Sequence, residues 1–166
     1  MRTIIIVQCR LSSTRLPQKA LYQLDNDVLL GWALKSMHKV NADDYFVACD
    51  VDSKSELAPV SCMNNFKIFA GSKDDVLDRF CKLIECENPD IVVRATADNP
   101  FLFYDAAQEL LDLYKEKYFD SVDYITFSGL PHGSGIEIFK ASSLLKARTL
   151  TELPYDHEHV GPSLYN

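Results

Sequence analysis

The sequence lacks several features that define large protein classes. The aliphatic run after Met1-Arg2-Thr3 is four residues long, and no apolar run approaches the roughly 20 residues of a membrane span or forms a signal peptide. The five cysteines form no C-x-x-C pair and leave one unmatched, which argues against a structural zinc site and a disulfide framework. A formal net charge of -7 argues against general nucleic-acid binding. We therefore expect a soluble, cytoplasmic protein with no membrane and no nucleic-acid partner.

Length and charge distribution restrict the number of domains and the kind of ligand that we expect. The 166 residues are enough for one well-cored domain and too few for two ordinary ones, so we expect a single domain over residues 1–166. Residues 1–40 hold six Lys or Arg against two Asp, whereas the rest of the chain holds eleven cations against twenty-two acids. Positive charge concentrated on an otherwise acidic protein suits one small anionic ligand.

Short apolar runs alternate with longer amphipathic runs, which predicts a layered α/β domain with a largely parallel sheet. The predicted strands are Thr3–Val7, Tyr45–Asp50, Lys67–Ala70, Ile91–Thr96, Tyr124–Phe127 and Ile136–Phe139. The predicted helices are Leu29–Val40, Asp74–Glu87, Asp105–Tyr118 and Ser142–Thr149. We expect Ser72 to be the N-cap of the second helix, with Asp78 and Arg79 near its start free to face a cleft.

The stretch from Ile4 to Leu21 joins an apolar strand to a loop of cations and hydroxyls. The loop carries Arg10, Arg15, Lys19, Ser12, Ser13 and Thr14. Fixed positive charge and short donors are what phosphate oxygens require, so the loop predicts a polyphosphate site. It has neither G-x-x-x-x-G-K-[ST] nor G-x-G-x-x-G, so its side-chain cations must carry more of the charge. The alternative is a solvated connection that happens to be basic.

Asp98 follows the predicted strand Ile91–Thr96 and precedes Asn99-Pro100. Open α/β sheets bind ligands beyond the carboxyl ends of their strands, which places Asp98 on the same rim as the cationic loop. Mg²⁺ commonly takes one or two carboxylates together with substrate phosphates and water, so Asp98 is a candidate magnesium ligand. The alternative is an Asx-turn or a helix cap.

Three weaker features remain open. Asp50-Val51-Asp52 ends a strand and would suit a metal-dependent phosphatase, although alternating acids there are more often a solvated turn. His157 and His159 flank Glu158 and invite a zinc hypothesis, but without helical ligand spacing they favour a polar surface or a substrate-side role. His132, in the glycine-rich segment 129–135, either contacts an anionic acceptor or is merely exposed.

Three motifs together indicate a known family. They read Gln8-x-Arg10-x-Ser12-Ser13-Thr14-Arg15-Leu16-Pro17-x-Lys19, then Asp75-Val76-Leu77-Asp78-Arg79, then Arg94-x-Thr96-x-Asp98-Asn99-Pro100. With further matches at Gly133, Glu137, Phe139 and Glu158-His159-Val160, the sequence resembles the cytidylyltransferase family of the spore coat polysaccharide biosynthesis type. That family is related to CMP-Kdo synthetases and acylneuraminate cytidylyltransferases.

The resemblance implies a three-layer nucleotide-diphospho-sugar transferase (Rossmann-like) fold and a Mg²⁺-dependent nucleotidyltransferase. Such an enzyme transfers CMP from CTP to a sugar or sugar-acid hydroxyl and releases pyrophosphate, here for surface polysaccharide biosynthesis. Arg10 and Lys19 would hold the triphosphate as catalytic residues, and Asp98 would bind the metal. The remaining implied roles are nucleotide binding by Gln8, Ser13, Arg15 and Arg79, and acceptor contacts by His132, Glu137 and His159.

The sequence departs from the family pattern in two places. Gln18 stands where the family usually has a glycine before the motif lysine, and Gly135 replaces the acid of Pro-x-Gly-x-Asp-x-Glu. Family members also commonly continue well beyond the Glu-His-Val segment. Gly135 and the shorter C-terminal part motivate a second hypothesis, a non-catalytic nucleotide-binding relative that acts as a regulatory or partner subunit. A homodimer is compatible with either hypothesis.

Overall fold

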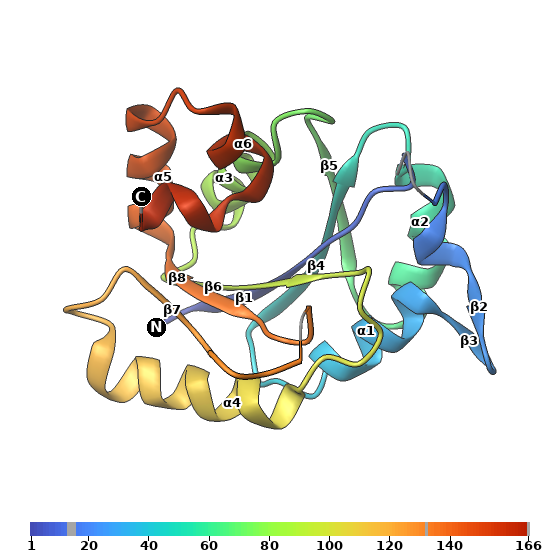
Figure 1. Ribbon diagram of the computed structural model, residues 1–166, viewed down its shortest axis with the longest axis horizontal. Helices are drawn as coiled ribbons and strands as arrows, with labels where there is room; N and C mark the ends of the chain where they lie inside the picture. The colour runs from blue at the N-terminus through green and yellow to red at the C-terminus, as the bar shows by residue number, and fades with distance from the viewer. Residues whose placement is uncertain (13–15, 132, 166) are drawn as a thin grey trace.

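The computed structural model describes residues 1–12, 16–131 and 133–165, and its elements form three layers with a sheet in the middle (Figure 1). The strands are β1 (Thr3–Gln8), β2 (Gln23–Leu24), β3 (Asp27–Val28), β4 (Asp44–Asp50), β5 (Lys67–Gly71), β6 (Ile91–Thr96), β7 (Tyr124–Thr126) and β8 (Glu137–Lys140). The helices are α1 (Leu29–Met37), α2 (Lys54–Met63), α3 (Val76–Glu87), α4 (Tyr104–Leu113), α5 (Ala141–Leu150) and α6 (Pro154–His159). Short 3₁₀ segments η1 (Lys19–Leu21) and η3 (Gly161–Leu164) and a π segment, η2 (Tyr114–Tyr118), complete the described elements.

The main sheet of the described residues has six strands in the order β5-β4-β1-β6-β8-β7. The first four are parallel, whereas β8 runs antiparallel to both β6 and β7. Gln8 at the end of β1 lies opposite Ala48 on one side and Thr96 on the other, so the loops that follow these strands share one edge. The predicted α/β architecture with a mostly parallel sheet is confirmed.

The core has two halves because successive side chains of a strand point to opposite faces. In β1, Ile5 and Val7 pack with α1, α2 and α4, whereas Ile4 and Ile6 pack with α3 and α5. All four are fully buried, which stabilises the fold by about 1.5–3 kcal/mol for each side chain. An apolar run buried on both faces is typical of a central parallel strand. Strand β1 therefore fixes the position from which the loop after Gln8 begins.

Three predicted helix boundaries differ from the structure by two residues or more. The first helix ends at Met37, three residues before the predicted Val40. The third helix is α-helical only to Leu113, and the π segment η2 continues it to Tyr118. The second begins at Val76, because Asp75 and not Ser72 is its N-cap: Asp75 Oδ1 accepts from the Asp78 N–H at 2.8 Å. The Ser72 hydroxyl instead accepts from the Asp75 N–H at 3.1 Å, so it shapes the turn before the helix.

The sequence patterns missed α2, α6 and the β2–β3 hairpin. Helix α2 contains Pro59 and buries only Leu57 and Ser61, so it has no apolar stripe to detect. Helix α6 spans just six residues after Leu153, with Pro154 in its first turn. In the described part of the chain no helix has both the length and the apolar character needed to cross a membrane.

Candidate active site

The rim at the carboxyl ends of β1 and β6 brings together charges from distant parts of the sequence. Lys19 Nζ lies 3.9 Å from Asp98 Oδ2, and Arg10 Nη2 lies 3.8 Å from Glu158 Oε1. The side chains of Arg10 and Lys19 are 47% and 38% exposed. Long, exposed ion pairs contribute little to stability, so both cations remain accessible to an anionic ligand. The predicted convergence of Lys19 with Asp98 is present.

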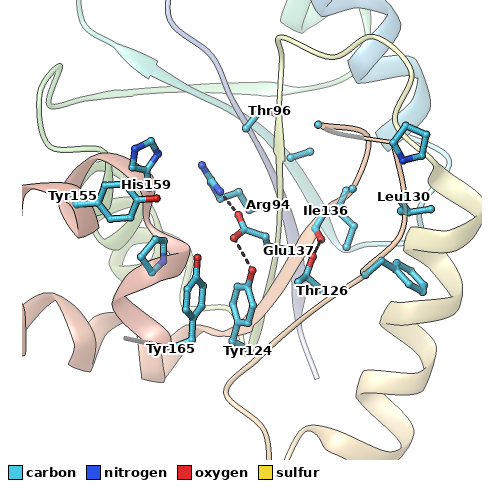
Figure 2. Close-up of a pocket in the computed structure, with 16 residues that line it drawn as sticks. Arg94, Thr96, Tyr124, Thr126, Leu130, Ile136, Glu137, Tyr155, His159 and Tyr165 are labelled. Atoms are coloured by element: carbon cyan, nitrogen blue, oxygen red, sulfur yellow. Dashed lines mark hydrogen bonds and ion pairs between the residues drawn. The ribbon is translucent and has the colours of Figure 1, made fainter.

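A second, more buried network lies beside this rim. The Gln8 Oε1 atom accepts from Arg94 Nε at 3.1 Å and from Arg94 Nη2 at 2.8 Å. Arg94 Nη1 pairs with Glu137 Oε2, and the Tyr124 hydroxyl donates to Glu137 Oε1 at 2.8 Å. Figure 2 shows Glu137 between Arg94 and Tyr124. Burial and the neighbouring Glu137 carboxylate hold the pKa of Tyr124 well above its usual range, so its hydroxyl stays a donor at neutral pH.

This network forms part of the wall of a pocket of about 430 Å³. Tyr155 and His159 enter from α6, with ring centroids 4.4 Å apart, and Tyr165 follows η3 (Figure 2). The lining residues are Arg94, Ala95, Thr96, Tyr124, Thr126, Phe127, Leu130, Pro131, Gly133, Gly135, Ile136, Glu137, Tyr155, His159, Pro162 and Tyr165. Aromatic rings beside hydroxyls and an ion pair suit a small polar molecule such as a sugar. Glu137 and His159, predicted on the acceptor side, both line this pocket.

Helix α6 connects the pocket with the rim through three consecutive side chains. His157 Nδ1 contacts Asp75 Oδ2 at 2.8 Å, and Glu158 reaches Arg10. His159 turns toward the pocket, so the two histidines of the zinc hypothesis have different surroundings. The Asp75 carboxylate raises the pKa of His157.

The chain reverses at Val160, directly after α6. Val160 has φ 65° although it is β-branched, and its side chain is fully buried. A positive φ is costly for such a residue. The turn therefore persists because the surrounding core holds the Val160 side chain.

The single carboxylate of Asp98 suits magnesium better than a metal that needs three or four protein ligands. The Asp98 side chain is 67% exposed and faces Lys19. Among residues 1–12, 16–131 and 133–165, no group of three or more His, Cys, Asp or Glu side chains could hold a metal ion. Mg²⁺ fits such a site because it keeps several waters and takes phosphate oxygens from the substrate.

Arg79 does not face a cleft as expected, because it is fully buried. Its Nε and Nη2 donate to the Ser72 carbonyl at 2.9 and 2.6 Å, and its Nη1 donates to the Ala48 carbonyl at 3.4 Å. Burial lowers the pKa of Arg79, and the charge of Asp50 opposes that shift. A Cβ at Gly71 would lie 2.8 Å from Arg79 Cγ, so the arginine fits only beside a glycine. Contact between Arg79 and a nucleotide stays a prediction.

Asp50 and Asp52 do not converge on a common ligand. Asp50 is fully buried and accepts from the N–H and the hydroxyl of Ser53, at 3.0 and 2.8 Å. Asp52 is exposed, and its Oδ2 lies 3.3 Å from Lys73 Nζ. A phosphatase centre built on these two acids is therefore not supported.

Gln18, at the family's glycine position, has φ 57°. This left-handed conformation explains why a glycine suits the position. Here the Gln18 side chain reaches Glu56, with Nε2 3.2 Å from Oε2. The departure from the family pattern is accommodated without removing the turn.

Ser13, Arg15 and His132 lie outside the described residues, so their predicted roles stay predictions.

Several site residues were not predicted from the sequence. Tyr155 and Tyr165 line the pocket from segments with no apolar periodicity. Arg94 belonged to a motif, but its partner Glu137 follows only from the antiparallel register that places the two opposite each other on β6 and β8. Ser53 was also missed, because one serine before an undetected helix carries no sequence signal.

Comparison with known proteins places this geometry in context. The sequence model of the family described as Cytidylyltransferase matches residues 4–166. The spore coat polysaccharide biosynthesis protein SpsF of Bacillus subtilis (strain 168) is 32% identical over 165 residues, which cover 95% of this chain and 67% of SpsF. A cytidylyltransferase structure from Leptospira borgpetersenii serovar Hardjo-bovis superposes with a TM-score of 0.91 at 27% identity, over 98% of this chain and 70% of that one.

A more distant structure shares the fold. A CMP:2-keto-3-deoxy-manno-octonic acid synthetase, solved in complex with CTP, has a TM-score of 0.76 at 14% identity and covers 99% of this chain and 85% of that one. The predicted nucleotidyltransferase fold is therefore confirmed, and Arg10, Lys19 and Asp98 lie on the rim of its sheet. A family match over nearly the whole sequence agrees with the resemblance found in its motifs. The chain belongs to the cytidylyltransferase family.

Proposed function

We propose that this protein is a cytoplasmic, Mg²⁺-dependent cytidylyltransferase that transfers CMP from CTP to a sugar or sugar-acid hydroxyl and releases pyrophosphate. The product would be an activated sugar for surface polysaccharide. The observation that carries the proposal is the 3.9 Å approach of Lys19 Nζ to Asp98 Oδ2 on a rim next to a 430 Å³ pocket. A cation for phosphate, a carboxylate for metal and a polar pocket for the acceptor are the three parts that the reaction requires.

In the proposed reaction, Arg10 and Lys19 bind the triphosphate and neutralise its charge. Asp98 would hold Mg²⁺, which supplies charge stabilisation for the phosphate chain and the departing pyrophosphate. The acceptor oxygen attacks the α-phosphorus in line, the bond from the α-phosphorus to the pyrophosphate oxygen breaks, and the hydroxyl proton passes to solvent. The pocket around Glu137 and His159 orients the acceptor. Positioning and electrostatic stabilisation supply most of the rate in such a transfer.

Calorimetric titration with CTP, UTP, GTP and ATP, with and without Mg²⁺, tests the proposal. We expect selective, Mg²⁺-assisted CTP binding in the wild type that weakens in Asp98→Ala. The matched control is Asp120→Ala, since Asp120 is an exposed acid after η2. A pyrophosphate-release assay with a panel of sugars and sugar acids then identifies the acceptor. Absence of nucleotide binding would refute the proposal.

Position 135 favours a second candidate, a nucleotide-binding relative without catalysis. Gly135 lines the pocket, and a Cβ there would meet only the Leu130 Cδ1 atom at 3.9 Å, an ordinary contact. The missing acid would therefore fit. CTP binding without pyrophosphate release in the wild type, together with release gained by Gly135→Asp, would favour this candidate.

A further inference from the structure

A buried chain of hydrogen bonds runs from the end of β4 to the loop after β1. The Asp50 carboxylate, fully buried, accepts from the Ser53 hydroxyl at 2.8 Å. The Ser53 Oγ atom in turn accepts from the backbone N–H of Leu11 at 3.1 Å. Ser53 and Leu11 are also buried, at 3% and 6% exposure, so water does not compete for these bonds. One serine thus joins a strand-end carboxylate to the cationic loop.

The backbone of Leu11 anchors the chain next to Arg10 and, through Gln18, next to Lys19. Its carbonyl accepts from the Gln18 N–H at 2.9 Å, immediately before Lys19. On its other side, the Cys9 N–H donates to the Ala48 carbonyl at 3.1 Å, so both neighbours of Arg10 are anchored. The backbone positions of Arg10 and Lys19, and with them the distance between the two side chains, therefore depend on Leu11.

Buried Arg79 supports the same region. Its Nη1 donates to the Ala48 carbonyl, which is also the acceptor for Cys9. Its positive charge interacts with the Asp50 carboxylate, which lies buried beside it. The carboxylate that orients Ser53 is therefore balanced without reaching solvent.

The Ser53 hydroxyl is not needed by its own helix. Ser53 occupies the N-cap position of α2, where a serine usually accepts from an amide of the first helical turn. Here its side chain makes no capping hydrogen bond. The hydroxyl instead donates to Asp50 and accepts from the Leu11 N–H. This arrangement is expected of a residue that holds Leu11 in place and does not cap its own helix.

We propose that Asp50 and Ser53 are positioning residues that set the spacing of Arg10 and Lys19 for a nucleoside triphosphate. This inference rests on the proposed CTP-binding function. Neither residue contacts the nucleotide, and both act through the Leu11 backbone. Without the serine hydroxyl, the Leu11 N–H loses its buried partner, and nucleotide binding must then hold Leu11 and Gln18 in place.

The test compares Ser53→Ala with Ser61→Ala in the full chain. Ser61 is a matched control because it lies on the same helix, is fully buried and donates only to the Leu57 carbonyl, at 2.8 Å. Ser53→Ala is expected to weaken CTP binding about tenfold, as one buried donor loses its partner. It should also speed hydrogen exchange at the Leu11 and Gln18 amides. Ser61→Ala should leave CTP affinity and those amides unchanged whatever its effect on the melting temperature, and Ser53→Thr should restore binding.

Equal CTP affinity in the two alanine variants, with unchanged exchange at Leu11 and Gln18, would overturn the inference. So would CTP affinity that falls in step with melting temperature in both variants. A wild type that binds no CTP would instead refute the proposed function, and the exchange rates would then decide the anchoring on their own.

Discussion

The cationic side chains on the rim differ sharply from those beneath it. Arg10 is 47% exposed, and its ion pair with Glu158 spans 3.8 Å. Arg79 is fully buried and donates to backbone carbonyls, and the Arg94 side chain is 11% exposed and bonded to Gln8 and Glu137. The resemblance to the family assigns Arg10 and Arg79 to the nucleotide, and it includes Arg94 in a motif without giving it a role. The structure separates charge accessible to a ligand from charge used to hold the scaffold.

Substitutions of the exposed rim cations and of the buried arginines should therefore affect different properties of the protein. An exposed ion pair contributes about 0–1 kcal/mol to stability, whereas removing one partner from a buried set of charges costs about 3–5 kcal/mol. Substitutions on the rim should change binding, and those beneath it should change the free energy of unfolding.

The largest effect is expected from Arg79→Met. The variant loses the hydrogen bonds to Ser72 and Ala48 and leaves the buried Asp50 carboxylate without a compensating charge. We expect the free energy of unfolding to fall by about 3 kcal/mol. Urea denaturation measures it, with Arg10→Met as the control that should change stability by less than about 0.5 kcal/mol. Equal losses in both variants would contradict the distinction between rim and scaffold.

Lys19→Ala should give the next largest effect, on binding alone. A charge-assisted hydrogen bond to phosphate contributes about 1.5–3 kcal/mol, so CTP affinity should fall by that amount in calorimetry. Lys117→Ala, which removes an exposed lysine of η2, should leave CTP affinity unchanged. Unchanged affinity in Lys19→Ala would remove the lysine from the site.

Glu137→Gln sharpens the comparison at the boundary between the two groups. The variant keeps the shape of the side chain but removes the charge that faces Arg94. We expect a stability loss of about 1–2 kcal/mol and lower acceptor turnover with unchanged CTP affinity. Weaker CTP binding in this variant would place Glu137 on the nucleotide side instead.

The contact between α6 and α3 should depend on pH. The folded pKa of His157 is raised by Asp75, so the stability from this pair is fully present below the usual histidine pKa and is lost as pH rises through the raised value. We expect the melting temperature of the wild type to exceed that of His157→Gln at low pH and the gap to close as pH rises. The gap corresponds to less than about 1 kcal/mol, because both side chains are partly exposed. A gap independent of pH would exclude the ion pair.

Gln18→Gly should have the smallest effect. Glycine relieves the left-handed conformation at φ 57° but loses the contact with Glu56 and makes the unfolded chain more flexible. These terms nearly cancel, so the unfolding free energy should change by less than about 1 kcal/mol. A larger loss in urea denaturation would show that the Gln18 side chain holds the loop.

Local patterns predicted the rim well because its geometry follows from parallel strands. Lys19 and Asp98 both follow strands of one parallel sheet, so the sequence was enough to predict their approach. The pairing of Arg94 with Glu137 could not be predicted in this way, since it depends on β8 running antiparallel and on its register. Helices α2 and α6 were missed because they bury few apolar side chains. The buried state of Arg79 was also hidden, because a charged residue on a helix normally indicates an exposed face.

Val160 matters for attempts to engineer this protein. Its φ of 65° favours glycine, but its fully buried side chain favours valine, and glycine would forfeit about 1.5–3 kcal/mol of burial. No single natural residue satisfies both demands. A search for thermostable variants should therefore leave position 160 unchanged and vary residues that do not fix the direction of α6, because His159 next to Val160 would otherwise move within the pocket.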